Sequence, residues 1–131
     1  MIKREIITSL KVRKSPWYAH AVRVENMVYT SGVTPVDPEN GAIGGDIREQ
    51  TFRVLTNLKN ILEAASSSLE SVVKVNTYLA EMDHFSEYNE VYGQFFREGN
   101  RPARTTIQVG KFKGGMLIEI DAISLVNDEG S

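Results

Sequence analysis

The segment NRPARTTIQVGKFKGGMLIEID, residues 100–121, contains two strand-like runs separated by a loop with adjacent glycines. Each run carries a charged side chain where a buried strand favours an apolar one, Arg104 in the first run and Glu119 in the second. Because side chains alternate between the two faces of a strand, Arg104 shares a face with Thr106 and Glu119 shares one with Asp121. Either charge alone is explained most simply as a solvated surface residue. Together they raise the question of whether they are halves of one binding site.

The residues outside this segment predict further strands and helices. Asp46 stands three residues before Glu49, as at the start of a helix, and Asp83 can cap a second helix. Aromatic and β-branched residues on both sides of Glu25-Asn26 predict a hairpin. The expected elements are a strand over 5–10, a hairpin over 18–32, a loop over 33–46, a helix over 47–65, a strand over 71–80, a helix between Asp83 and Gly99, strands over 104–110 and 116–125, and a frayed tail over 127–131.

Apolar residues at regular spacing indicate which face each element buries. The stripes are Phe52, Leu55, Leu58, Leu62 and Ala65 in the first helix and Phe85, Tyr88, Tyr92, Phe95 and Phe96 in the second. In the strand over 71–80, alternation predicts one face with Val73, Val75, Thr77 and Leu79 and another with Val72, Lys74, Asn76 and Tyr78. Whether the face of Arg104, Thr106 and Gln108 or the face of Thr105, Ile107 and Val109 meets the helices stays open.

The order β-β-β-α-β-α-β-β predicts an α+β fold, with one mixed sheet and two helices on one of its faces. The other face of the sheet is then half polar and half apolar. Such a face suits burial against other subunits around a wet cavity, so the pattern points toward a homo-oligomer.

Length and composition limit the functions that the chain can have. With 131 residues, one domain over 1–131 is expected. The formal net charge of −2 gives no basic surface for nucleic acid, and the absence of cysteine excludes disulfides and thiolate nucleophiles. No apolar run approaches the length of a membrane helix, and the N-terminus lacks the apolar core of a secretory signal. A cytoplasmic protein without membrane contact is therefore expected.

Other kinds of site find little support. Ser31 precedes Gly32 at the end of a predicted strand, where a hydroxyl can point into a cleft, but the spacing Gly-x-Ser-x-Gly is absent. His20 and His84 lack the spacing of metal ligands, so no metal site is expected. The glycines before Asp46 are not followed by the lysine of a phosphate-binding loop.

Three segments carry a resemblance to a known family. They are NMVYTSGVTPVDPENG at 26–41, HFSEYNEVYGQFF at 84–96 and RPARTTIQVGKFKGGMLIEI at 101–120. The last resembles the signature of the RidA family, also called YjgF, in which Pro-Ala-Arg precedes a strand and a glutamate lies between hydrophobic residues in the next strand. The resemblance covers nearly the whole chain, and its motifs occur in the expected order.

The resemblance implies a chorismate-mutase-like fold, a homotrimer and clefts between its subunits. It also implies hydrolytic deamination of reactive 2-imino or enamine acids to 2-keto acids and ammonia, without a cofactor. The enzyme expected is a hydrolase like the 2-iminobutanoate/2-iminopropanoate deaminases. The alternatives kept open are a non-catalytic regulatory trimer that binds small carboxylates and a pathway-specific deaminase, such as one for 2-aminomuconate. A nuclease role, also attached to the family, gains no support from the net charge of −2.

The same resemblance assigns roles to single residues. Arg104 matches the arginine that grips the substrate carboxylate, and Glu119 matches the glutamate that positions or activates water. The residues implied to bind substrate are Tyr18, Ser31, Gly32, Asn89, Tyr92 and Thr106, with Trp17 as the rival of Tyr18. Thr106 stands where many members have cysteine, which argues against thiol chemistry. Whether one subunit supplies both Arg104 and Glu119 stays open.

Overall fold

Six strands form one sheet in the computed structural model, which describes residues 1–127. The strands are β1 Arg4–Ile7, β2 Ala21–Val24, β3 Met27–Thr30, β4 Val72–Leu79, β5 Ala103–Gln108 and β6 Ile118–Leu125, in the spatial order β1-β2-β3-β6-β4-β5. The β4–β5 pair is parallel and the other pairs are antiparallel, so the sheet is mixed, as expected. Apart from Asn127, the predicted frayed tail lies outside the described residues.

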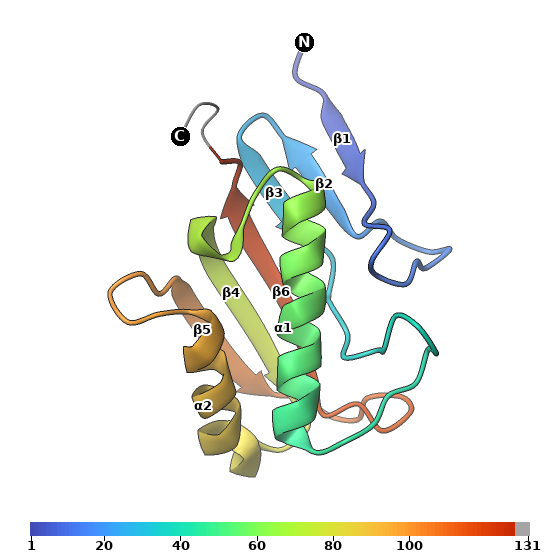
Figure 1. Ribbon diagram of the computed structural model, residues 1–131, viewed down its shortest axis with the longest axis vertical. Coiled ribbons are helices and arrows are strands. Elements are labelled where there is room, and N and C mark those ends of the chain that lie inside the picture. Colours follow the sequence, from blue (N-terminus) through green and yellow to red (C-terminus); the bar gives the residue numbers. More distant parts are fainter. Residues whose placement is uncertain (128–131) are drawn as a thin grey trace.

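Two helices, α1 Ile47–Ala64 and α2 Phe85–Phe95, cover the same face of this sheet (Figure 1). Short 3₁₀ turns at Leu69–Ser71 and Met82–His84 lead into β4 and α2. A continuous cluster of buried apolar side chains fills the space between the helices and the sheet. The predicted α+β order and the placement of both helices on one face are confirmed.

Helix α1 begins where the sequence predicts. Asp46 caps this helix: its backbone is extended, and its side chain accepts a hydrogen bond from the backbone N–H of Glu49 at 3.0 Å. Phe52, predicted to be buried, is instead 53% exposed and packs edge-on against Phe95 of α2. The buried face is turned away from Phe52 and includes Val54 and Leu58.

Helix α2 differs from the prediction at both ends. Asp83 does not cap it, because Asp83 lies inside the 3₁₀ turn and His84 occupies the capping position without a side-chain hydrogen bond. The helix ends at Phe95, before Gly99. Phe85, expected in the buried stripe, is 38% exposed.

Strand β4 contains a bulge that reverses the predicted orientation of its first residues. The pairing with β6 shifts register between Val72 and Lys74. Because one extra residue exchanges the two faces of a strand, Val72 is buried and Val73 is 44% exposed, the opposite of the prediction. Beyond the bulge, Val75, Thr77 and Leu79 are buried as expected.

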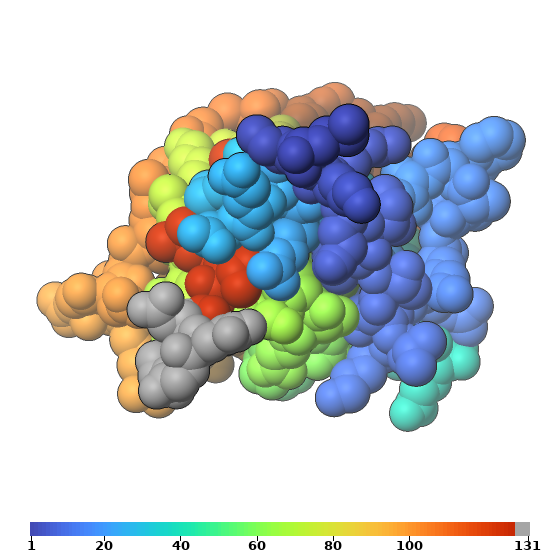
Figure 2. All heavy atoms as spheres, turned by 90° about the horizontal axis from the view of Figure 1, so that it is seen from above, coloured from blue at the N-terminus to red at the C-terminus, as the bar shows by residue number. Residues whose placement is uncertain are grey.

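The hairpin of β2 and β3 turns at Glu25-Asn26, as predicted, with Glu25 at a φ of 52°. Figure 2 views the end of the molecule where this turn meets the ends of α1 and β6. There the backbone N–H of Val126 donates to the carbonyl of Asn26 at 2.8 Å, and that of Asn127 donates to Ser66 at 2.8 Å. These bonds hold the end of β6, which lies inside the sheet between β3 and β4.

Candidate active site

Arg104 lies on the helix-covered face of the sheet, at the start of the edge strand β5. Its Cα partner on β4 is the buried Val75. Its Nη1 donates to Asn89 Oδ1 at 2.8 Å and to the Tyr88 hydroxyl at 3.3 Å, both on α2. The face of β5 that carries Arg104 and Thr106 is therefore the one that meets α2.

Aromatic rings of α2 surround the Arg104 guanidinium. Its central carbon lies 5.6 Å from the ring centroid of Phe85, 5.1 Å from that of Tyr88 and 4.6 Å from that of Tyr92. Such contacts attract a cation and restrict its rotation. Within residues 1–127 the hydrogen bonds of Arg104 use Nη1 alone, which leaves Nε and Nη2 for a ligand. A planar pair of donors fits a carboxylate bidentately.

A cavity of about 460 Å³ opens beside Arg104. It is lined by Asn89, Tyr92, Gly93, Arg101, Pro102 and Arg104. Among residues 1–127, this lining includes two arginines and no acidic side chain, so the cavity favours an anion. Burial raises the pKa of the Tyr92 hydroxyl to about 12, so this group stays protonated at neutral pH. Thr106 is on the same face of β5 as Arg104, and its Oγ1 lies 3.4 Å from the Tyr88 hydroxyl.

Glu119 lies on the other face of the sheet, in a second group of predicted residues. It is half-buried on β6, and its carboxyl group lies so close to Gly32 that an added Cβ there would be 2.9 Å from Glu119 Cδ. The neighbouring Ser31 donates its hydroxyl to the carbonyl of Ala19 at 2.6 Å. Burial, and next the charge of Asp121, raise the pKa of Glu119 above its ordinary value. A carboxyl with a raised pKa takes up and returns a proton more readily than an ordinary one, as a general base must.

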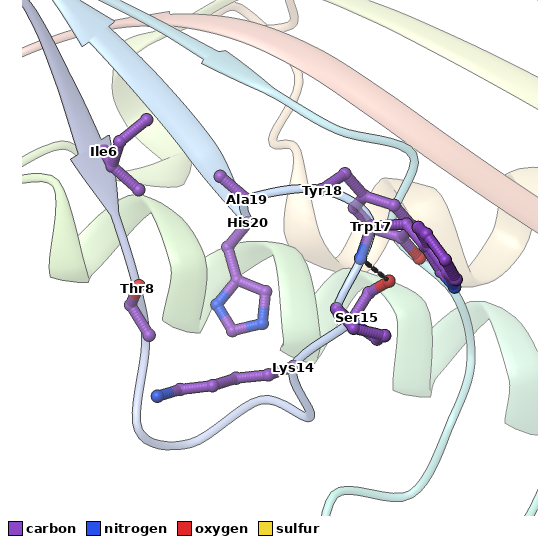
Figure 3. Close-up of a pocket in the computed structure, with 9 residues that line it drawn as sticks. Ile6, Thr8, Lys14, Ser15, Trp17, Tyr18, Ala19 and His20 are labelled. Carbon is purple, nitrogen blue, oxygen red and sulfur yellow. Dashed lines mark hydrogen bonds between the residues drawn. The ribbon is translucent and has the colours of Figure 1, made fainter.

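The loop before β2 carries the two aromatic candidates near this second group. Figure 3 shows Trp17 and Tyr18 at one side of a cavity of about 390 Å³. Trp17 is 88% exposed and Tyr18 is 52% exposed, so both are available to a ligand. The buried His20 holds the loop, because its Nδ1 accepts from the Ser9 N–H at 3.0 Å and its Nε2 donates to the Arg13 carbonyl at 2.8 Å.

The two groups of predicted site residues face away from each other within one chain. Arg104 aligns with Val75 on β4 and so belongs to the helix-covered face. Glu119 is the Cα partner of Tyr78, which belongs to the opposite, open face with Ile107 of β5. One chain therefore brings together Arg104, Asn89, Tyr92 and Thr106, and separately Glu119, Ser31 and Gly32, near the loop of Tyr18.

The structure adds residues to the site that sequence reasoning had placed only in the core. Phe85 and Tyr88 surround Arg104 with Tyr92, at spacings of three and four residues along α2. That spacing put all three on one helix face. Their contact with Arg104 could not be read from the sequence, because it depends on the position of α2 over β5.

Within the described residues 1–127, no group of three or more His, Cys, Asp or Glu side chains could hold a metal ion. No helix in the same range has the length and apolar character needed to cross a bilayer.

Comparison with known proteins supports this description of the fold. The family model for endoribonuclease L-PSP matches residues 10–126. A RutC family protein of Pyrococcus abyssi is 42% identical over 125 residues, covering 95% of this chain and 98% of that protein. The 2-iminobutanoate/2-iminopropanoate deaminase of Rattus norvegicus is 36% identical over 126 residues, covering 95% of this chain and 91% of that enzyme. The crystal structure of Escherichia coli TdcF with bound serine superposes with a TM-score of 0.86 at 33% identity, covering 94% of this chain and 99% of that one.

Proposed function

The chain belongs to the RidA family, and we propose that it hydrolyses reactive 2-imino acids and their enamine tautomers to 2-keto acids and ammonia. The observation that carries the proposal is the Arg104 guanidinium, held by Asn89 and three aromatic rings beside an open cavity. A small 2-imino acid has a carboxylate that can accept from the two free nitrogens of this guanidinium. The named activity of the rat relative supports the choice of reaction.

The active unit in this proposal is a homotrimer with its sites in clefts between subunits. Arg104 and Glu119 lie on opposite faces of one chain, so they cannot act on one small substrate within that chain. A site that uses both needs the Arg104 face of one subunit against the Glu119 face of the next. A cyclic trimer repeats such a head-to-tail contact three times.

In this trimer, residues of two neighbouring subunits bind different parts of the substrate. Arg104 binds the substrate carboxylate, and Tyr92 and Asn89 border the same cavity. Ser31, Gly32 and Tyr18 of the neighbouring subunit orient the imine carbon near Glu119. Holding reactant and water in place supplies much of the rate in such a reaction, because the iminium carbon is already electrophilic. The proposed reaction needs no metal or organic cofactor.

Glu119 moves the protons. Its carboxylate takes a proton from the water whose oxygen bonds to the iminium carbon, which gives a neutral carbinolamine and a protonated Glu119. Glu119 returns that proton to the amine nitrogen. The carbon–nitrogen bond then breaks as the carbinol oxygen forms the carbonyl, and the hydroxyl proton leaves with ammonia as ammonium. The products are the 2-keto acid and ammonium, and Glu119 is again ionised.

The activity is tested with 2-iminobutanoate and 2-iminopropanoate, generated in situ by a dehydratase or an amino-acid oxidase. Because these imines hydrolyse rapidly in water, the rate of keto-acid release is measured at several concentrations of the protein. A rate that rises in proportion to the protein supports the proposal. A rate equal to the uncatalysed one at every concentration contradicts it. A parallel assay with 2-aminomuconate tests the pathway-specific alternative.

The division of the site between subunits has a separate test. Arg104→Ala and Glu119→Gln are each expected to lose turnover. For Glu119→Gln the rate should fall roughly 10²–10⁴-fold. After unfolding and refolding as a 1:1 mixture, about a quarter of the sites should combine an intact Arg104 with an intact Glu119 from different chains. Recovery of activity supports the shared site. A mixture as inactive as its components contradicts it.

One observation favours a second function, a trimer that binds small carboxylates without turnover. The TdcF relative holds serine in its crystal structure. In this reading Arg104 still binds the ligand, whereas Glu119 has no proton to move. Binding of 2-ketobutanoate in calorimetry, together with no turnover in the imine assay, would favour this second function.

A cytoplasmic location remains a prediction that cell fractionation can test.

A further inference from the structure

A network of polar side chains on the open face of the sheet holds Asp121 in place. Asp121 Oδ1 accepts from Asn76 Nδ2 at 2.8 Å, and Asp121 Oδ2 accepts from the Tyr78 hydroxyl at 2.7 Å. Both oxygens thus act as acceptors, as they do in an ionised carboxylate. Both donors come from β4, so the orientation of Asp121 is fixed by the neighbouring strand.

Glu119 lies next to this network on the same face. Asp121 follows Glu119 by two residues on β6, which places the two about 7 Å apart along the strand. Tyr78 is the Cα partner of Glu119, yet its hydroxyl reaches diagonally to Asp121. The strand that could have supplied a donor to Glu119 therefore supplies both of its donors to Asp121.

We infer that Asp121, held by Asn76 and Tyr78, is a positioning residue that keeps a fixed negative charge beside Glu119 and so favours the proton-bearing form of Glu119. The inference rests on the proposed function, in which Glu119 must both take and return a proton. Two nearby carboxyl groups in different surroundings divide such work, one staying charged and the other exchanging the proton.

Within one chain, the other groups around Glu119 do not cancel this charge. In the proposed trimer the partner subunit's Arg104 also faces Glu119, and it is present equally in the wild type and in every variant compared below. Gly32, which lies against the Glu119 carboxyl group, and its chain neighbour Ser31 are uncharged. On the strands beside β6, the open face carries Tyr29 of β3 and Tyr78 and Lys74 of β4 as titratable groups. The Lys74 ammonium points to β5, where it donates to Thr105 Oγ1 at 2.7 Å.

The direction of the pKa shift agrees with this geometry. Burial raises the pKa of Glu119, and the Asp121 charge raises it further. The bond to Asp121 raises the pKa of the Tyr78 hydroxyl to about 12, so Tyr78 remains a donor over the working pH range. Asp121 thereby acts through Glu119 and needs no contact with substrate.

The test follows the titration of Glu119 itself by carbon-13 NMR of protein labelled at the glutamate side-chain carboxyls. The Glu119 signal is assigned by its absence in Glu119→Gln. Asp121→Asn keeps the shape and removes the charge, so Glu119 should titrate at lower pH than in the wild type. Asp121→Ser, which removes the same charge with a smaller side chain, should give the same direction. An unchanged or higher titration pH in both variants overturns the inference.

Lys74→Gln is the matched control, because it removes a charge of opposite sign from the same face. It should leave the titration of Glu119 in place or move it to higher pH. If Lys74→Gln lowers it as Asp121→Asn does, the effect comes from a disturbed sheet and the inference fails. The NMR readout needs no turnover, so a protein inactive on imines would refute the proposed function and still decide the role of Asp121. In an active protein, the acid limb of the kcat/KM profile should move to lower pH in Asp121→Asn.

Discussion

Asn89 Oδ1 accepts a hydrogen bond from Arg104 Nη1 at 2.8 Å, from one turn of α2 across to the edge strand β5. The amide is uncharged, so it orients the guanidinium without neutralising it. Arg104 therefore keeps its full charge for a ligand while one of its nitrogens is occupied. An acid at position 89 would hold the same nitrogen and would also compete with the ligand carboxylate.

Asn89→Asp is accordingly expected to weaken the binding of 2-ketobutanoate by at least tenfold, measured by calorimetry. The new carboxylate forms an ion pair with Arg104 that a ligand must displace. Gln94→Glu is the control, because it adds the same charge to an exposed position of α2. Equal weakening in the two variants would show that general repulsion, and not the contact with Arg104, is responsible.

Arg104→Lys is expected to bind 2-keto acids nearly as poorly as Arg104→Ala. Lysine keeps the charge but loses the planar fork and its contacts with the rings of Tyr88 and Tyr92. Loss of a desolvated charged contact typically costs roughly 2–5 kcal/mol. Calorimetry measures the affinity and light scattering checks the assembly. Near-normal affinity in Arg104→Lys would mean that charge alone binds the ligand.

Gly32→Ala is expected to reduce turnover strongly while leaving ligand binding by Arg104 intact. The added Cβ would lie 2.9 Å from Glu119 Cδ, so the Glu119 carboxyl must move away. The end of a flexible side chain can move at little cost to the fold. Gly44→Ala is the matched control, since its Cβ would meet nothing within 4 Å. If Gly32→Ala kept the wild-type kcat, the position of the Glu119 carboxyl beside Gly32 would be irrelevant to catalysis.

Glu119→Gln is expected to raise thermal stability at pH 7 while it abolishes turnover. The folded state raises the pKa of Glu119, mainly by burial, so it disfavours the ionised form. The stability of the wild type is therefore fully present below the unfolded-state pKa and declines as pH rises through the folded-state value. Glutamine does not ionise, so Glu119→Gln avoids this decline in stability. Its melting temperature should exceed that of the wild type at pH 7 and equal it near pH 3. Melting curves at equal protein concentration measure it.

The exposed Glu81 provides the control for this pH dependence. Glu81→Gln should change the melting temperature little at either pH. A Glu119→Gln variant less stable than wild type at pH 7 would show that the Glu119 carboxylate makes a favourable contact in the folded protein.

The fold could be predicted largely from local pattern, since the order of elements, the hairpin turn and the Asp46 cap are all present in the structure. The errors have a common origin in tertiary geometry. The bulge at Val72–Lys74 exchanges the faces of Val72 and Val73, and no residue type marks it in advance. The 3₁₀ turn before α2 removes Asp83 from the capping position.

For the candidate site, residue types and alternation correctly placed Glu119 opposite the buried Ile118 and Ile120. They left the face of Arg104 undecided, because the face that meets α2 carries the polar Arg104, Thr106 and Gln108, whereas the open face carries Ile107. The face follows from the parallel pairing of β5 with β4, which depends on the whole crossover through α2. Arg104 and Glu119 were therefore recognisable singly, but their opposite orientation was not.

The Arg104 group and the Glu119 group lie on opposite faces of one chain, and this has a consequence for covariation among relatives. If the two halves meet only between chains, a change at Asn89 or Tyr92 is selected together with a change at Ser31 or Gly32 of another copy. Aligned relatives should then show coupled substitutions between positions that lie on opposite faces of a single subunit. A contact map drawn from such couplings would contain pairs that one chain cannot satisfy, and those pairs would trace the surface on which the copies meet.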